Sequence, residues 1–349
     1  MDVASRNKAL RVGVLGAGRI GRVHTQILSR LGVTVVAIAD PSEERGQSLA
    51  REFGVAKVTT KVEDIFNDPT IHAVLICSPT DLHAQHIHQA AAAKKHIFCE
   101  KPIALDLGVV DAAVHAVEAA GVKMMVGFNR RFDANFKRIR KAVIDGEVGD
   151  VGMIRITSRD PSAPPVSYIK VSGGIFCDMT IHDFDMARFL VGSEVEQVFV
   201  MAQARDPEIG AAGDVDTAVV CLRFKNGVLG YIENSRVAAY GYDQRVEILG
   251  SKGAVSCENN YPNTVTISTG TSIARDLPLH FFIDRYMDAY KDELSAFVDV
   301  CLDPRTAPPV SGHDGRQALK LGLAATRSMK ENRPVLLSEF DAPPMVGRL

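Results

Sequence analysis

Short runs of apolar, β-branched residues alternate with helix-forming segments through residues 8–126 of this 349-residue chain. Apolar runs without polar alternation indicate strands buried on both faces, and helices between such strands indicate parallel crossover connections. The expected strands are RVGVLG, TVVAIAD, VAKVTT, AVLICSP, HIFCEKP and MMVGFNR, and the expected helices cover residues 19–31, 42–53, 83–93 and 106–120. The pattern therefore predicts a doubly wound α/β domain over residues 8–126.

The rest of the chain has a different pattern, in which longer strands follow one another after a helix near residues 133–145. These strands are expected at residues 151–160, 194–205, 217–226, 227–236 and 244–258, with helices at 283–301 and 315–331. Glycine-containing turns such as KNG and GSKG separate several strands, which favours hairpins and a mostly antiparallel, open sheet. Residues 127–341 are thus predicted to form a second α/β domain, and a cleft between packed domains is the default ligand site.

A glycine-rich loop, GAGRIG, joins the first expected strand to the first expected helix. The first glycine permits a tight turn, the second lets the backbone approach a pyrophosphate, and the third allows close packing of the helix. The amino end of that helix would supply amide donors to phosphate oxygens. The cofactor-binding residues expected here are Gly16, Gly18, Arg19, Ile20 and Gly21.

An acidic residue, Asp40, ends the second expected strand 19 residues after Gly21. Its carboxylate can accept hydrogen bonds from the adenine ribose hydroxyls, and its charge would repel the 2′-phosphate of NADP. The sequence therefore predicts NAD as the cofactor, although the guanidinium of Arg45 could weaken that preference. The alternative is that the glycines only form a strand-to-helix turn and that Asp40 only caps the next helix.

Two more candidate segments follow strands whose carboxyl ends bind ligands in open α/β sheets. One contains Ser78, Thr80 and His83, and the other contains Glu100 and Lys101. All five residues are expected to contact the cofactor. Lys101 lies between a buried strand and a proline, so its side chain has restricted freedom and can reach the mouth of the sheet. The alternatives are a turn with a helix-face histidine in the first segment and a solvated Glu100–Lys101 ion pair in the second.

The composition argues against several classes of function. The 40 Lys and Arg residues nearly balance the 42 Asp and Glu residues, so neither a nucleic acid nor a membrane surface is an expected partner. The six cysteines are far apart and form no C-x-x-C pair, which indicates reduced, buried thiols rather than a zinc or redox motif. No apolar segment of signal-peptide or membrane-spanning length stands out, and a cytoplasmic protein is expected.

These motifs, together with a later D-x-x-x-H pattern at Asp178 and His182, resemble the glucose-fructose oxidoreductase/inositol dehydrogenase/MocA family. The strings GFNRRFD, SRDP, GGIFCDMTIHDFDMARF and YGYDQRVEILGSKG are most similar to its inositol dehydrogenases. The resemblance covers nearly the whole chain. It implies a Rossmann domain, a second α/β domain for substrate binding and oligomerisation, a homotetramer, and an enzyme that needs no metal.

The D-x-x-x-H segment is expected to be helical from about residue 176, where Asp178, His182 and Asp185 occupy positions i, i+4 and i+7 of one stripe. Imidazole is the side chain whose ordinary pKa lies nearest neutrality, so His182 is predicted as the general base for oxidation of a secondary alcohol. Asp178 would orient the imidazole and stabilise its protonated form. Lys101 would hold the substrate oxygen. The resemblance assigns catalytic roles to the same Lys, Asp and His.

The resemblance also implies substrate contacts by Asn129, Arg130 and Asp185, in addition to Lys101, Asp178 and His182. Asp185 could instead pair with Arg188, three residues later, and the pair at 129–130 could cap an interdomain hinge. Two tyrosines at pocket positions in similar sequences are alternatively core residues, Tyr240 and Tyr286.

The activity that the resemblance implies is NAD-dependent oxidation of a ring secondary hydroxyl of myo-inositol to the 2-keto form, scyllo-inosose. Other inositol isomers and aldopyranoses such as glucose stay open, because their rings present hydroxyls in similar geometry. Two further alternatives are NAD-dependent glycoside hydrolysis and a catalytically silent NAD or sugar sensor. A metal site at residues 178–185 is a weaker interpretation, because Lys101 can supply the charge stabilisation that a metal would provide.

Overall fold

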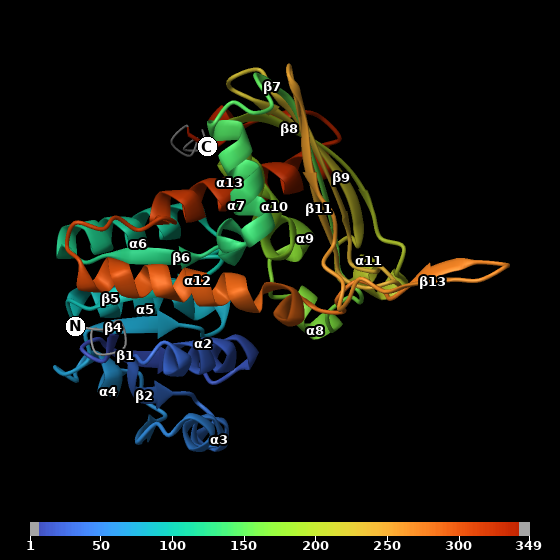
Figure 1. The fold of residues 1–349 in the computed structure, drawn as a ribbon. Coiled ribbons are helices and arrows are strands. Elements are labelled where there is room, and N and C mark those ends of the chain that lie inside the picture. Colours follow the sequence, from blue (N-terminus) through green and yellow to red (C-terminus); the bar gives the residue numbers. More distant parts are fainter. Residues whose placement is uncertain (1–6, 342–349) are drawn as a thin grey trace, which may run out of the picture. The chain divides into compact units, whose positions relative to one another are not determined.

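The computed structural model describes residues 7–341, which divide into two compact units. The first unit extends to Asn129 and also includes Asp288–Gln317. The second contains Arg130–Met287 and continues from Ala318. Each unit is built around its own sheet (Figure 1).

The first unit contains a six-stranded parallel sheet in the order β3-β2-β1-β4-β5-β6, which confirms the predicted doubly wound fold. Its strands are β1 (Arg11–Leu15), β2 (Thr34–Ala39), β3 (Lys57–Thr59), β4 (Ala73–Ile76), β5 (His96–Glu100) and β6 (Met124–Gly127). The helices between them are α2 (Arg19–Arg30), α3 (Glu43–Phe53), α4 (Glu63–Phe66), α5 (Thr80–Ala92) and α6 (Leu107–Ala120). The strand order reverses between β1 and β4, where open α/β sheets form their ligand crevice.

A segment from the carboxyl-terminal part of the chain completes this first unit. It includes most of α12 (Phe282–Leu302) and the start of α13 (Gly312–Glu331). Phe297 of α12 makes an edge-on contact with Phe98 of β5, with ring centroids 5.5 Å apart. Lys123 Nζ donates to three backbone carbonyl oxygens at and just beyond the end of α12. The chain therefore departs from the continuous second domain expected at residues 127–341, because this apolar helix face covers the first sheet.

The second unit contains a seven-stranded sheet in the order β12-β11-β7-β10-β9-β8-β15. Its strands are β7 (Val151–Arg159), β8 (Val195–Gln203), β9 (Thr217–Phe224), β10 (Leu229–Ser235), β11 (Asp243–Gly250), β12 (Gly253–Cys257) and β15 (Val335–Leu336). Strands β7 and β10 are parallel neighbours, and the other neighbouring pairs are antiparallel. The predicted, mostly antiparallel sheet is thus confirmed, with one parallel pair at its centre.

Side chains alternate between the two faces of this sheet. Ile154 and Ile156 of β7 and Ile232 of β10 are buried, and α10 contacts both strands. The helices are η1 (Asn129–Phe132), α7 (Ala134–Ile144), α8 (Val166–Ile169), α9 (Gly174–Asp178), α10 (Thr180–Val191), α11 (Pro207–Ala211) and η2 (Leu337–Phe340). Large apolar side chains of the opposite parity are exposed: Met153, Met201, Val219, Leu229 and Leu249. One face of the sheet is therefore core and the other faces solvent.

A separate two-stranded ribbon, β13 (Thr266–Ser268) and β14 (Ile273–Arg275), projects from the end of this sheet (Figure 1). Its residues are exposed, including Ile267 and Ile273. The prediction from sequence did not include this ribbon, because its alternation of Thr and Ser with Val and Ile continues for only a few residues.

Candidate functional site

The GAGRIG loop has the backbone geometry that its glycines predicted. Gly16 has a φ of +102°, a conformation that favours glycine. A Cβ on Gly21 would lie 2.0 Å from the carbonyl oxygen of Gly16, so only glycine allows α2 to start this close to the loop. A Cβ on Gly18, by contrast, would meet no atom of residues 7–341 within 4 Å. The loop therefore leaves open space beside its backbone at the amino end of α2, as pyrophosphate binding requires.

Asp40 lies at the end of β2 beside this loop and is 4% exposed. Its carboxylate accepts hydrogen bonds from the backbone N–H groups of Ala17 and Ser42, both at 2.8 Å, and pairs with Arg45 at 2.9 Å. Burial opposes ionisation, but these three donors together hold the pKa of Asp40 below its ordinary value. Asp40 is thus an ionised hydrogen-bond acceptor at the edge of the loop. Arg45 is close enough to influence whether this site favours the ribose of NAD or the 2′-phosphorylated ribose of NADP.

His83 is buried between the loops that follow β4 and β5. Its Nδ1 lies 2.8 Å from the carbonyl oxygen of Pro102, and its Nε2 lies 2.8 Å from that of Ser78. The ring is 2% exposed and joins the backbone of the two loops, and its predicted contact with the cofactor stays a prediction. Thr80 begins α5 and is half-buried.

Glu100 is also turned into the first unit. Its Oε1 lies 2.7 Å from Nε2 of His24, a fully buried residue of α2, and its carboxylate rests against Gly127, where a Cβ would lie 3.1 Å away. A solvated Glu100–Lys101 ion pair is therefore wrong for Glu100. The carboxylate links the helix of the glycine loop to the strand that precedes Lys101, which is itself half-buried.

The helix predicted from about residue 176 is broken in the second unit. Helix α9 ends at Asp178, Met179 has φ −96° and ψ −60°, and α10 begins at Thr180. Met179 keeps a right-handed helical conformation, so only one irregular residue separates the two helices, and the common stripe of Asp178, His182 and Asp185 stays a prediction. Asp178 accepts hydrogen bonds from the hydroxyl of Tyr168 at 2.9 Å and from Nη1 of Arg236 at 3.2 Å. His182 lies in the first turn of α10 and is half-buried.

A buried polar network fixes that first turn of α10. Asp183 is fully buried and pairs with Arg130 of η1. Asn234 donates to Asp183 at 2.9 Å and accepts from Thr180 at 2.7 Å. Burial raises the pKa of Asp183, while Arg130 and Asn234 oppose the rise. Arg130 also donates to the hydroxyl of Tyr242 at 3.3 Å, so its predicted substrate contact would come from a guanidinium already held on two sides.

Asp185 forms a bidentate ion pair with Arg131, whose Nε lies 2.8 Å from Oδ2, and it is 1% exposed. Arg188, the alternative partner in the sequence analysis, lies 3.8 Å away. Both carboxylate oxygens bond Arg131, and the predicted substrate contact of Asp185 stays a prediction. Its role here is to fasten α10 to η1.

Two residues of this region were missed in the sequence analysis, Asp160 and Arg236. Each directly follows a strand, β7 or β10, and parallel neighbours end at the same edge of a sheet. Asp160 donates its backbone N–H to Ser235 at 2.9 Å, next to Arg236. Burial raises the pKa of Asp160 to about 6, and the charge of Asp178 adds to the rise, while Arg130 and Arg236 oppose it. The sequence contains these two residues in the strings SRDP and NSR. Only the pairing of β7 with β10 shows that Asp160 and Arg236 lie close together.

The two candidate tyrosines have different environments. Tyr286 is 2% exposed and lies edge-on to Tyr242, and burial raises its pKa to about 12. Among the described residues, its hydroxyl has no hydrogen-bond partner. Tyr240 is 37% exposed and bonds Asp243 and Arg159, each at 2.6 Å. The core alternative therefore fits Tyr286 and is wrong for Tyr240.

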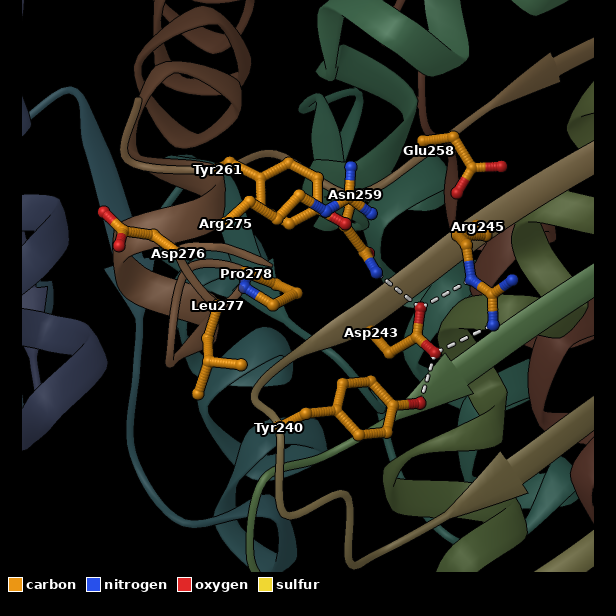
Figure 2. Close-up of a pocket in the computed structure, with 10 residues that line it drawn as sticks. All are labelled: Tyr240, Asp243, Arg245, Glu258, Asn259, Tyr261, Arg275, Asp276, Leu277 and Pro278. Carbon is orange, nitrogen blue, oxygen red and sulfur yellow. Dashed lines mark hydrogen bonds and ion pairs between the residues drawn. The ribbon is translucent and has the colours of Figure 1, made fainter. Parts of the chain in front are cut away.

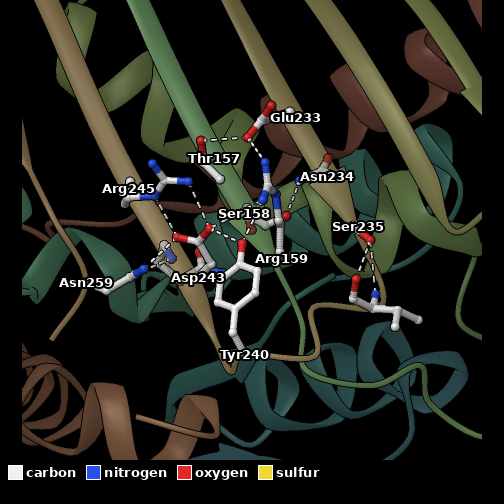
Figure 3. A network of polar contacts seen from close by, with 12 residues as sticks. Thr157, Ser158, Arg159, Glu233, Asn234, Ser235, Tyr240, Asp243, Arg245 and Asn259 are labelled. Atoms are coloured by element: carbon white, nitrogen blue, oxygen red, sulfur yellow. Dashed lines mark hydrogen bonds and ion pairs between the residues drawn. The ribbon is translucent and has the colours of Figure 1, made fainter. Parts of the chain in front are cut away.

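Tyr240 instead lines a polar cavity of about 340 Å³ on the second unit (Figure 2). The carboxylate of Asp243 lies in its wall, where it accepts from Tyr240, Arg245 and Asn259 (Figure 3). Its lining residues lie between positions 240 and 278, whereas the predicted catalytic residues are Lys101, Asp178 and His182. Asp243 and Arg245 form an ion pair in this wall, and Arg275 lies over the ring of Tyr261.

Two kinds of feature are missing from residues 7–341. They contain no group of three or more His, Cys, Asp or Glu side chains arranged to hold a metal ion. None of their helices combines the length and the apolar composition that crossing a membrane requires. Their six cysteines are free, and Cys77, Cys99 and Cys177 are buried.

Comparison with known proteins identifies the family. Residues 10–128 match the family model described as an oxidoreductase family with an NAD-binding Rossmann fold. Residues 136–256 match the GFO/IDH/MocA C-terminal domain. The chain belongs to the GFO/IDH/MocA family. It is therefore an oxidoreductase with an NAD-binding Rossmann domain, and the contacts of Gly18 and Asp40 with NAD stay a prediction.

The sequences of several relatives align with this chain over nearly its full length. Myo-inositol 2-dehydrogenase of Thermotoga maritima is 48% identical over 332 residues, covering 95% of this chain and 99% of the relative. Inositol 2-dehydrogenase of Rhizobium meliloti is 48% identical over 332 residues, covering 94% and 99%. The structure of scyllo-inositol dehydrogenase from Lactobacillus casei with bound NAD(H) and scyllo-inositol has a TM-score of 0.88 at 29% identity, covering 94% and 99%.

Proposed function

We propose that this GFO/IDH/MocA member oxidises a ring secondary hydroxyl of myo-inositol to the 2-keto form, with NAD⁺ as the acceptor. The observation that carries the proposal is the near-full-length identity of 48% to two relatives that are both named for 2-dehydrogenation of inositol. The proton chemistry of such an oxidation is assigned to His182 together with Asp178, whose carboxylate accepts hydrogen bonds from Tyr168 and Arg236.

The proposed catalytic residues divide the reaction between them. NAD⁺, when bound, supplies the acceptor for the hydride that leaves the carbinol carbon. His182 takes the hydroxyl proton as the carbonyl forms, and Asp178 stabilises the protonated imidazole. Lys101 holds the substrate oxygen and stabilises its developing negative charge. The substrate thus loses one proton and one hydride, and each has a named destination.

The proposed cofactor contacts follow from the geometry of the first unit. Backbone N–H groups from Gly16 to Gly21 bind the pyrophosphate, and Asp40 accepts from the ribose hydroxyls. Ser78 and Thr80 line the loop after β4. Glu100 and His83 act indirectly, because their side chains hold the loops that carry Lys101 and Ser78.

We propose fewer substrate contacts than the sequence resemblance implied. Asn129 and Arg130 stay candidates for the ring hydroxyls, with Arg130 oriented by its pair with Asp183. Asp185 is reassigned to a structural role because Arg131 occupies both of its oxygens. An uncharged polyol needs several such oriented donors and acceptors, since apolar contacts discriminate weakly between isomers.

We further propose a cytoplasmic homotetramer. The exposed apolar side chains on the solvent face of the second sheet, such as Met201 and Leu249, offer a surface that a second copy of the chain could bury. Light scattering after size-exclusion chromatography would give the subunit number directly. A monomer at working concentrations would contradict this part of the proposal.

The function is tested by following reduced nicotinamide with NAD⁺ or NADP⁺ against myo-, scyllo- and chiro-inositol and glucose. Turnover with NAD⁺ and myo-inositol is expected to be the fastest. Faster turnover with another polyol would keep the mechanism and change the substrate. If NAD⁺ binds but none of the four is oxidised, the proposal fails in favour of a glycosidase or a sensor.

A further inference from the structure

Arg236 is a buried arginine that lies just beyond the end of β10, with its side chain 1% exposed. A guanidinium that is removed from water destabilises the fold unless it is paired with an anionic group. Its two pairs are both aspartates: Nη1 lies 3.2 Å from Oδ2 of Asp178, and Nη2 lies 3.4 Å from Oδ2 of Asp214. One cation therefore bridges two carboxylates, one of which is the proposed partner of the catalytic imidazole.

The second carboxylate fixes the opposite end of α9. Oδ1 of Asp214 accepts from the backbone N–H of Ile175 at 3.0 Å. It also lies against Gly174, where a Cβ would be 2.8 Å from this oxygen, and Gly174 has a φ of +77°. Asp214 thus holds the first turn of α9, while Asp178 is its last residue. Arg236 connects the two ends of this short helix and sets the angle from which Asp178 enters the break before α10.

The surroundings of Asp178 are rich in ionisable groups from several elements. They are Tyr168 of α8, Cys177 of α9, Asp183 of α10, Arg130 of η1, Asp160 after β7, Asp214 before β9 and Arg236 after β10. Four of these groups, counting Asp178 itself, are carboxylates, and two are guanidiniums. Removing one guanidinium would therefore change the local charge substantially.

We propose that Arg236 is a positioning residue for Asp178, which orients this carboxylate and offsets part of its charge, and so sets the pH at which the proposed base accepts a proton. The inference rests on the proposed function. A carboxylate near an imidazole favours the protonated ring, and a cation on that carboxylate weakens the effect. Without Arg236, the imidazole would stay protonated to higher pH, and a protonated ring cannot act as a base.

The test is the pH dependence of kcat/KM for myo-inositol oxidation by the full-length Arg236→Met variant. The acid limb is expected to move up by about one pH unit, the lower end of the range for a nearby charge. NADH affinity, followed by the fluorescence of NADH itself because the chain has no tryptophan, is expected to be unchanged. Arg236→Lys keeps the charge and should restore most of the wild-type profile, although without the two-sided geometry.

A matched control is Arg245→Met, which removes another arginine of the same unit that is paired with an aspartate, Asp243. It is expected to leave the acid limb in place. The coupling is tested by adding Arg236→Met to Asp178→Asn, where a smaller shift than in the wild-type background is expected because one of the two charges that Arg236 offsets is gone. An unshifted profile in a folded Arg236→Met variant, or equal shifts in both arginine variants, would overturn the inference.

A second variant decides the case in which Arg236→Met does not fold. Asp214→Asn keeps an acceptor for Ile175 and removes one of the two charges that share the guanidinium. Its acid limb is expected to move to lower pH, opposite to the shift for Arg236→Met. A shift to higher pH or none would overturn the inference. Failure of the proposed function looks different, since the wild-type protein itself would then oxidise none of the polyols.

Discussion

The glycine loop of the first unit and the α9–α10 region of the second determine their geometry in different ways. The loop is determined by consecutive residues and by contacts of the backbone with itself, such as Gly21 against the carbonyl of Gly16. The α9–α10 region is determined by ion pairs between residues far apart in sequence, 58 positions for Arg236 with Asp178 and 53 for Arg130 with Asp183. A short motif can therefore specify a cofactor loop, whereas a buried charge network needs the whole fold.

The largest effect is expected at the proposed base. His182→Ala removes the proton acceptor, and kcat should fall by about 10²–10⁴-fold, the usual contribution of a general base. NADH affinity should stay near the wild-type value, because the glycine loop is determined locally in the other unit. Steady-state kinetics and NADH fluorescence check the two parts separately. Wild-type turnover by this variant would remove His182 from the mechanism.

The charge network should be sensitive to the loss of a single partner. Asp183→Asn leaves Arg130 buried without a counter-charge, and the free energy of unfolding should fall by about 3–5 kcal/mol, as for other broken buried ion pairs. Denaturant unfolding gives this value. Asp145→Asn, which removes a solvent-facing pair with Lys141, is the matched control and should change little. Equal losses in the two variants would mean that burial of the pair is not what matters.

The glycine loop should be sensitive to a single methyl group at one position and tolerant at another. Gly21→Ala places a Cβ against the Gly16 carbonyl, and should lower the free energy of unfolding by about 1–3 kcal/mol and weaken NAD more than about tenfold. In Gly18→Ala the added Cβ lies in open space, so this variant should keep the wild-type stability and lose only affinity for NAD. Thermal unfolding with and without NAD separates these outcomes. If Gly18→Ala binds NAD normally, the pyrophosphate does not approach there.

The carboxyl group of Asp160 should make the stability of the folded protein depend on pH. Its carboxyl pKa is about 6 when folded, against an ordinary value of 3.8, so the folded state binds more protons between these values. Its contribution to stability is therefore lost as pH rises from about 4 to 6, and the cost is complete above that range. Asp160→Asn has no such cost and should be more stable than wild type by about 1–2 kcal/mol near pH 8, with little difference near pH 4. Unfolding measured across pH checks the sign.

The smallest effect is expected at the edge of the loop. Asp40→Ser removes the ribose acceptor and frees Arg45, so NAD affinity should fall about tenfold while NADP affinity rises. Arg45→Ala in the same background should cancel the gain for NADP. Affinities of the reduced cofactors, measured by their fluorescence, give both changes. An unchanged preference would argue against the ribose contact of Asp40.

Much of the fold and the cofactor loop could be predicted from sequence, because the signals are local. Uninterrupted apolar strands, the GAGRIG loop and the acid at Asp40 each depend on a few neighbouring residues, and the structure places all of them as expected. The irregular residue Met179 between α9 and α10 could not be predicted, since the helical pattern of the sequence is continuous there.

The sequence could not show which protein groups bond the candidate site residues, because those partners come from other segments of the chain. Asp185 was expected to contact substrate, and in the fold its carboxylate also pairs with Arg131. His83 was expected to contact the cofactor, and in the fold its ring nitrogens each lie 2.8 Å from a backbone carbonyl oxygen. A motif can therefore indicate the position of a polar residue without indicating its protein partners.

The return of residues 288–317 to the first unit has a consequence for biosynthesis. The ring of Phe98 and the surface near Ile103 and Met124 are covered by Phe297, Gly315 and Gly312. A ribosome that has made only the first 129 residues has released every strand of the parallel sheet without the segment that covers this surface. The nascent parallel sheet therefore stays partly uncovered until six of the seven strands of the other sheet, β7 to β12, have been translated.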